Sequence, residues 1–268
     1  MNLAASIEWP DGATVCNALR NGTGSGVKIA ILDSGVEMTH SAFQGRELLD
    51  DLVFKAEADE FTIVQEPGQG EDTYGHGTAI AWLIWSLAPE AEIGSFRIMG
   101  EGRLASKRLI VRAAAQEALR RGYHVLNCSF GHRAAALYAL DYKEWVDAAY
   151  VTGSSIVAAC DNAGSQHQVF PAHFTSVIGV DRLAHLDPEA IMRRSGQIVE
   201  FAALGENVSV PWNGGGWKTV IGSSYATPRV TALVARLLSV LPSLTAAQVK
   251  ATLQAMAIPA PSELNSVG

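Results

Sequence analysis

Short apolar runs, separated by stretches of helical length, recur along the chain. Runs rich in β-branched residues predict buried strands at 27–35, 92–99, 124–131, 154–160 and 175–181. The first run, VKIAILDSG, passes directly from apolar residues into an aspartate, a serine and a glycine. Such a change from apolar to polar residues is typical of the point where a buried strand ends.

The longer segments between and after these runs predict helices at 106–122, 133–152, 226–242 and 243–257. Ser106 is a candidate cap for the first of them, and Gly122 is its stop. The helix at 226–242 is apolar on nearly every face, which predicts a helix in the centre of the domain. The last helix has a candidate cap in the Thr245–Gln248 region.

Strands that alternate with helices predict an α/β fold, in which a mainly parallel central sheet carries helices on both faces. No linker, repeat or block of charge divides the chain, so we expect one domain over 25–258, an N-terminal extension over 1–24 and a C-terminal tail over 259–268. In such sheets function sits at the carboxyl ends of the strands. Asp33, Ser129 and Asn162 follow three of the apolar runs and are therefore candidates for a site.

Composition narrows the class of partner. Hydrophobic residues make up 48% of the 268 residues, and the formal net charge is −7, which argues against nucleic acid or an anionic membrane as the main partner. The longest apolar stretch, 79–88, is too short to span a bilayer. No secretory signal is visible, so we expect a cytoplasmic protein, or a secreted one if the sequence has been trimmed.

The cysteines and the other possible ligands point to no metal and no cofactor. The three cysteines, Cys16, Cys128 and Cys160, have no metal-ligand spacing, and an odd number argues against a disulfide framework. We therefore expect three reduced, buried thiols.

Three short segments carry candidate chemistry. Asp33 ends the first apolar run, His76 lies between two glycines, and the pair Ser223–Ser224 precedes a buried helix. Each has an ordinary structural interpretation: a turn aspartate, a lone structural histidine and a helix cap. Together they fit nucleophilic catalysis, because a buried carboxylate fixes the tautomer of an imidazole that takes a proton from a hydroxyl group.

The boxes AILDSGV, GHGTAIA and GSSYATPRV, in this order, resemble those of the subtilisin-like serine proteases, the subtilases of peptidase family S8. The resemblance covers roughly residues 25–255 and implies the three-layer subtilisin-like fold with a catalytic triad of Asp33, His76 and Ser224. Ser223 is then the residue that shapes the turn. A fourth box, IVAACDNAG, implies that Asn162 donates to the oxyanion, although a turn residue is the alternative for Asn162 alone.

The same resemblance implies how substrate is held, as an extended strand between the segments NCSFGHRA and GEGRLAS, which line S1 on one side and S2 and S4 on the other. In VFPAHF, Val169 would close S1 and Pro171 would follow a cis bond. The implied substrate-binding residues are Gly100, Gly102, Leu104, Ser129, Phe130, Gly131, Ala159, Cys160, Asp161 and Val169.

Several positions depart from the family pattern. Asp161 stands where glycine is usual, and we expect it to keep the turn through a left-handed backbone. Its carboxylate would favour a basic P1 residue if it faced S1 and would have no such effect if it faced solvent. Ala79, Trp82 and Arg229 also replace commoner residues. The helix after His76 lacks the loop that helps to bind a structural calcium in secreted relatives, so we expect no calcium there.

The sequence favours a serine endopeptidase with an Asp-His-Ser triad that acts on a peptide or protein substrate. Two alternatives stay open. Only about two dozen residues precede the domain, so either a pro-region has been removed or the chain folds without one as an intracellular peptidase of restricted specificity. The first alternative is a maturation protease or macrocyclase for a precursor peptide, although no helical insert lies near His76. The second is a pseudoprotease that only binds peptides.

Overall fold

The computed structural model describes residues 9–100, 104–133 and 136–260, without the side chains of 104–106 and 136–138. The helices are α1 (Gly12–Asn21), η1 (Ser41–Phe43), α2 (His76–Leu87), α3 (Leu104–Arg120), α4 (Ala136–Thr152), α5 (Ser223–Val240) and α6 (Ala246–Met256). The strands are β1 (Lys28–Asp33), β2 (Asp50–Ala56), β3 (Ile63–Pro67), β4 (Glu92–Arg97), β5 (Val125–Cys128), β6 (His132–Arg133), β7 (Ser155–Ala159), β8 (Val169–Phe170), β9 (Ile178–Leu183), β10 (Met192–Arg193), β11 (Phe201–Leu204), β12 (Val208–Trp212), β13 (Gly216–Val220) and β14 (Ile258–Pro259).

One large sheet runs through the molecule in the order β14-β10-β11-β9-β7-β5-β1-β4-β2-β3. The seven strands from β11 to β2 pair in parallel, and β10 and β3 pair antiparallel at the two ends of that block. The predicted α/β fold with a mainly parallel sheet is therefore confirmed. The seven strands of the block present their carboxyl ends along one edge of the sheet, where β5 lies between β1 and β7.

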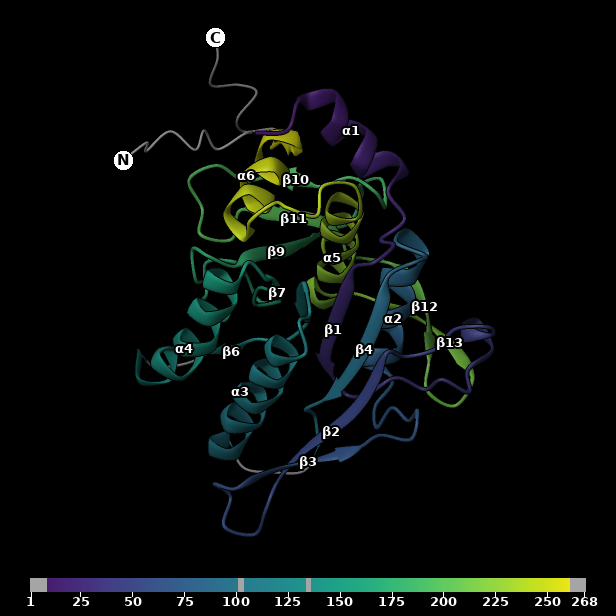
Figure 1. Cartoon of the computed structure of the whole chain (residues 1–268), viewed down its shortest axis with the longest axis vertical. Coiled ribbons are helices and arrows are strands. Elements are labelled where there is room, and N and C mark those ends of the chain that lie inside the picture. Colours follow the sequence, from purple (N-terminus) through teal and green to yellow (C-terminus); the bar gives the residue numbers. More distant parts are fainter. Residues whose placement is uncertain (1–8, 101–103, 134–135, 261–268) are drawn as a thin grey trace.

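Helices cover both faces of this sheet, as Figure 1 shows, with α3 and α4 on one side and α2 and α5 on the other. The strand β1 explains why both faces are covered, because Ile29 and Ile31 belong to one core and Ala30 and Leu32 to the other. A strand that is apolar on both sides needs a helix layer over each. The helix α5 is buried along most of its length, which confirms the prediction for 226–242. Across the described ranges, no helix combines the length and the apolar character that crossing a membrane requires.

Element ends differ slightly from the predicted ones. The helix α3 begins at Leu104 rather than at Ser106, and α2 begins at His76 because Gly75, at φ 106°, makes the left-handed turn into it. The run 124–131 supplies β5 and then leaves the sheet, and β6 pairs with β8. At α6 the expected cap is present, since Thr245 and Gln248 form a reciprocal capping box.

The sequence did not predict one helix and two hairpins, because their hydrophobic patterns are weak. The hairpins β2–β3 and β12–β13 have short, partly exposed strands, and α1 lies within the segment predicted as an N-terminal extension. The helix α1 packs on α5 and buries Val15 and Ala18 in the core. It carries Cys16 on its exposed face, so the prediction of a buried thiol was wrong there. Cys128 and Cys160 are buried, and burial raises the pKa of both thiols.

Candidate active site

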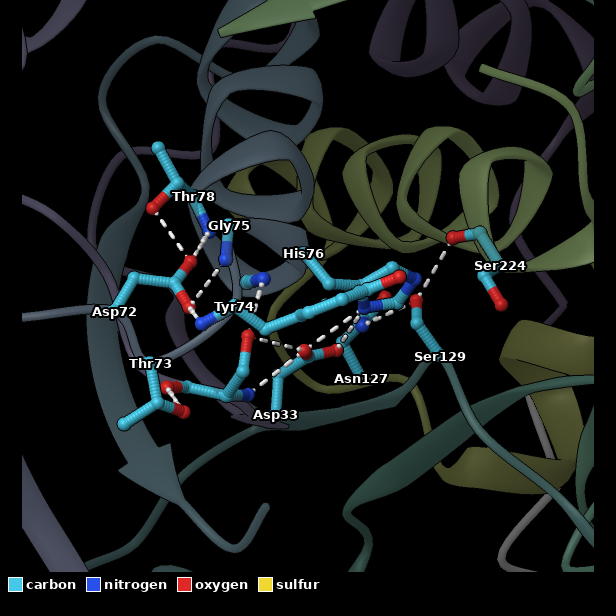
Figure 2. Close-up of polar contacts among 12 residues, drawn as sticks. Asp33, Asp72, Thr73, Tyr74, Gly75, His76, Thr78, Asn127, Ser129 and Ser224 are labelled. Carbon is cyan, nitrogen blue, oxygen red and sulfur yellow. Dashed lines mark hydrogen bonds and ion pairs between the residues drawn. The ribbon is translucent and has the colours of Figure 1, made fainter. Parts of the chain in front are cut away.

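The end of β1 places Asp33 beside the first residue of α2. The Asp33 side chain is fully buried, and both of its oxygens accept from His76 Nδ1, at 2.8 and 2.9 Å (Figure 2). The backbone N–H of Ser34 also donates to Asp33 Oδ1, at 2.8 Å. Because a carboxylate only accepts, the proton of the imidazole sits on Nδ1, and Nε2 is left as a base.

The pKa of His76 reflects two opposed effects. Burial lowers it, and the charge of Asp33, the hydrogen bond from Nδ1 and the charge of Asp72 raise it, with a net rise above 6.5. The close approach of α2 to β1 depends on Gly77, since a Cβ there would lie 2.1 Å from the carbonyl oxygen of Gly35. The second glycine of the GHG box therefore allows the helix to seat the histidine on the aspartate.

Asp72 holds the turn that precedes His76, and the sequence analysis missed it. Its carboxylate accepts from the N–H groups of Tyr74, Gly75 and Thr78, at 2.7 to 2.9 Å, and from the Thr78 hydroxyl at 2.6 Å. The N–H of Thr78 is one that the start of α2 leaves without a partner, and those of Tyr74 and Gly75 belong to the turn that leads into it. An aspartate a few residues before a helix is a local signal for a turn whose N–H groups its side chain accepts, and it could have drawn attention to Asp72.

Ser224 is the second residue of α5, which leaves its backbone N–H without an acceptor inside the helix. Pro228, four residues further on, has no N–H to donate to the carbonyl of Ser224. The hydroxyl of Ser129 donates to that carbonyl instead, at 2.9 Å. Ser129 in turn accepts from Asn127, whose side chain accepts from Thr231 on α5. A buried chain of hydrogen bonds thus ties the start of α5 to the end of β5.

The two serines of the GSS segment have different environments. Ser223 is fully buried and donates from its hydroxyl to the carbonyl of Cys160, at 2.7 Å, whereas Ser224 is partly exposed. Figure 2 shows His76 between Asp33 and Ser224. The hydrogen bonds of the described residues do not include one from Ser224 Oγ to His76, as is common without substrate. The ring of Tyr225 packs on the imidazole, with 5.3 Å between the ring centres.

The exposed side chain of Asn162 lies against the start of α5. Its Oδ1 accepts from the N–H of Ser223 at 2.9 Å and from the Ser223 hydroxyl at 3.2 Å. A Cβ built on Gly222 would lie 3.6 Å from Asn162 Nδ2, so the amide group is next to the residue that precedes the two serines.

The structure brings some of the predicted substrate-binding residues together. Gly100, Phe130 and Gly131 line a pocket of about 240 Å³ together with Ile98, Met99, Lys107, Val111 and His132. Gly131 lies close to Val169, since a Cβ on it would be 3.2 Å from the Val169 Cβ. The peptide bond before Pro171 is cis, as expected.

Other predicted substrate-binding residues are placed less favourably for contact with a ligand. The side chains of Ala159 and Cys160 are buried, and the hydroxyl of Ser129 is engaged with Ser224, which leaves only the backbone of Ser129 for the expected pairing with substrate. Leu104 begins α3, but its side chain is outside the described part of the chain. Gly102 lies outside the described residues altogether.

The expected left-handed backbone at Asp161 was wrong. Among the described residues, only Glu60 and Asn207 are non-glycine residues with positive φ, so Asp161 does not use a left-handed backbone. Its carboxylate forms a two-pronged ion pair with Arg133 of β6 and accepts from the N–H of Ala163 at 2.8 Å. The hydrogen bond from Arg133 is the main reason why the pKa of Asp161 falls to about 2.

Within the described ranges, no group of three or more histidine, cysteine, aspartate or glutamate side chains is arranged to hold a metal ion.

A parallel α/β sheet that brings an Asp–His pair and a helix-start serine to one edge defines the class of serine hydrolases with a triad. The profile of the Subtilase family matches residues 24–268, and the chain belongs to that family.

The relatives are proteases. The chain is 28% identical to the M-protease of Shouchella clausii (strain KSM-K16) over 244 residues, which cover 87% of this chain and 60% of that protein. It is similar to the crystal structure of a cold-adapted subtilisin-like serine proteinase, with a TM-score of 0.69 and 25% identity over 88% of this chain and 83% of that one. The prenylagaramide maturation protease PagA shares the fold, with a TM-score of 0.60 and 19% identity over 85% and 80% of the two chains.

Proposed function

We propose that the chain is a serine endopeptidase that hydrolyses peptide bonds through an acyl-enzyme, with Asp33, His76 and Ser224 as its triad. The observation that carries the proposal is the buried hydrogen bond between Asp33 and His76 at the sheet edge where α5 presents Ser224. Membership of a family whose named relatives are proteases supports the same reaction.

In the first half of the reaction, His76 Nε2 takes the proton of Ser224 Oγ while this oxygen attacks the carbonyl carbon of the substrate. Asp33 holds the Nδ1 proton and stabilises the imidazolium that forms. His76 then gives its proton to the leaving amine, the C–N bond breaks, and an ester on Ser224 remains. In the second half, water loses a proton to His76 and hydrolyses the ester.

Two donors are available for the negative oxygen of the tetrahedral intermediates. The N–H of Ser224 has no acceptor inside α5, and the amide of Asn162 lies next to the residues that precede Ser224. Removing one such donor costs about 3–4 kcal/mol of transition-state stabilisation in serine proteases. We assign the side-chain donor to Asn162.

The substrate binds as an extended strand between the segments around Gly100 and around Phe130. Main-chain hydrogen bonds give affinity in this mode, and pockets select side chains. The pocket of about 240 Å³ that these segments line is largely apolar and has Lys107 and His132 among its lining residues. It would take an apolar side chain of the substrate on the acyl side of the cleaved bond.

The peptidase has restricted specificity and acts inside the cell. The pocket of about 240 Å³ beside the Gly100 and Phe130 segments supports the narrow specificity, because such pockets select side chains of the substrate. Incubation with unfolded casein tests it, because an enzyme of narrow specificity leaves most casein intact. Degradation of casein as complete as that by a digestive protease would contradict the proposal while leaving the catalytic assignment in place.

A maturation protease for a precursor peptide is the second candidate, favoured by the shared fold with PagA. Cleavage-site profiling with a diverse peptide library separates the two: strong preference at several positions supports maturation, and weak preference supports general turnover. A macrocyclase would also release a cyclic product. Mass spectrometry identifies this product because its mass is one water lower than that of the linear product of hydrolysis.

A fluorophosphonate probe tests the proposed reaction itself. We expect the wild-type chain to be labelled on Ser224 and the Ser224→Ala variant to be unlabelled, with Ser223→Ala as the control that keeps the reactive serine. A chain that is not labelled and cleaves no library peptide would be a pseudoprotease, and the proposal would be wrong.

A further inference from the structure

Two segments of the chain orient the side-chain amide of Asn162: the start of α5 and Arg182 of β9. Arg182 of β9 donates from Nη1 both to Asn162 Oδ1 and to the Asn162 carbonyl oxygen, each at 3.0 Å. Oδ1 also accepts from the N–H of Ser223 at 2.9 Å, so it faces two groups, this N–H and Arg182 Nη1, that can only donate. A flipped amide would direct its own N–H groups at these donors, so the network holds Nδ2 on the opposite side. Within the described residues, Nδ2 donates to no protein group.

Arg182 is itself held in place. Its Nε donates to Glu206 Oε1 at 3.0 Å, and about a quarter of its side chain is exposed. The stem of Arg182 lies against Gly205, where any Cβ would be 2.8 Å from the Arg182 Cβ and 2.6 Å from the carbonyl oxygen of Gly222. The guanidinium group thus has a carboxylate on one side and the Asn162 amide on the other, within a segment that packs directly on the start of α5.

We propose that Arg182, fixed by Glu206, is a positioning residue that orients and polarises the Asn162 amide for oxyanion binding. The inference depends on the proposed function of the same site. A charged donor on Oδ1 withdraws electron density from the amide and strengthens Nδ2 as a donor, because hydrogen bonds in a chain polarise one another. The side chain of Asn162 is exposed, so without this contact only Ser223 limits its rotation.

Kinetics of three variants measure the effect. We expect Arg182→Ala to lower kcat about 10-fold with KM nearly unchanged, since misplaced catalytic groups cost about this much or more. Arg182→Lys should fall between wild type and Arg182→Ala, because an ammonium group is a point charge that cannot donate in the same fork geometry. Arg121→Ala is the matched control, since Arg121 forms a similarly exposed ion pair far from the site, with 29% of its side chain exposed.

A double-mutant cycle with Asn162→Ala separates positioning from a general structural role. If Arg182 acts through the amide, Arg182→Ala should change kcat less than about 2-fold in the Asn162→Ala background. The affinity for a peptide aldehyde, which forms an oxyanion on Ser224, should fall in parallel with kcat across the variants. The affinity for the corresponding peptide alcohol should not fall.

Two results would overturn the inference alone: an unchanged kcat in Arg182→Ala, or the same loss of kcat with and without Asn162. Thermal melting of each variant checks that the fold is intact, and the conservative Arg182→Lys variant keeps the test usable if Arg182→Ala is unstable. A wild-type chain that neither hydrolyses peptides nor reacts with a fluorophosphonate would refute the proposed function and this inference with it.

Discussion

The two halves of the candidate site are held in different ways. The half formed by Asp33 and His76 is buried, and its hydrogen bonds join neighbouring groups across the contact between β1 and α2. The half around Asn162 and Asp161 lies near the surface, where two ion pairs from different strands hold it. One half is thus fixed by packing, and the other by long, charged side chains.

This difference separates two requirements of the chemistry. A general base needs a fixed tautomer and a raised pKa, which a buried carboxylate supplies. The side-chain oxyanion donor, Asn162, needs access to the substrate, so burial cannot hold it, and the charged side chain of Arg182 takes that role. Variants of Asp33 and His76 should therefore affect the reaction most, and variants of the two arginines that hold the second half should have smaller effects on rate or on substrate choice.

The largest expected effect follows from Asp33→Asn. The neutral amide cannot hold His76 in the required tautomer, and loss of about 10⁴-fold in kcat is expected. In the wild type the raised pKa of His76 means that kcat/KM rises with pH through a value above 6.5. In the variant burial still lowers that pKa while the raising effect of Asp33 is gone, so the acidic limb should move to lower pH. A limb that stays in place would show that Asp33 does not control His76.

Asp72→Ala should have the next largest effect. It leaves the N–H groups of Tyr74, Gly75 and Thr78 without their acceptor next to His76, and a loss of about 2–4 kcal/mol in the free energy of unfolding is expected. Denaturant unfolding measures this, and kcat should fall as well. Asp59→Ala is the control, because Asp59 accepts similar bonds in an exposed turn. If both variants lose the same stability and activity, Asp72 has no special role beside His76.

Arg133→Ala should change specificity rather than rate. It frees the Asp161 carboxylate, whose pKa of about 2 depends chiefly on Arg133, and an unpaired carboxylate attracts a cation. We expect the preference for lysine or arginine at P1 to rise about 10-fold in kcat/KM, a change that one charged hydrogen bond can supply. The double variant Arg133→Ala/Asp161→Ala should lose this gain. No change in P1 preference would mean that Asp161 does not face the substrate.

The smallest effect is expected from a chelator. Hydrogen bonds and ion pairs of the chain itself hold both halves, and the segment after His76 runs as a single helix, α2, without an oxygen-rich loop. Melting curves with and without EDTA should therefore superimpose. A large fall in Tm would reveal a structural cation and would weaken the view that side chains alone fix the site.

The fold and the triad candidates could be predicted because their signals are local. Asp33 ends an apolar run, His76 stands in a GHG box, and Ser224 precedes a buried helix, so each is visible within about ten residues of sequence. The parallel sheet follows from the alternation of strands and helices, and its carboxyl edge gathers the three residues.

The contacts that support the site could not be predicted, because they join distant segments. Arg182 and Asn162 are 20 positions apart, and Arg133 and Asp161 are 28 apart. An arginine on a strand has no sequence signature for its partner, so neither the ion pair of Asp161 with Arg133 nor the contact of Asn162 with Arg182 was predictable. Asp72 is the exception, since its position before a helix start is a local signal.

The helix α1 has a practical consequence. Cys16 is the one exposed thiol among the three cysteines of the chain, and α1 precedes β1, so it lies at the opposite end of that strand from Asp33 (Figure 1). A maleimide dye or a thiol-reactive resin should therefore couple at a single position, and the immobilised molecule would present its cleft to the solution.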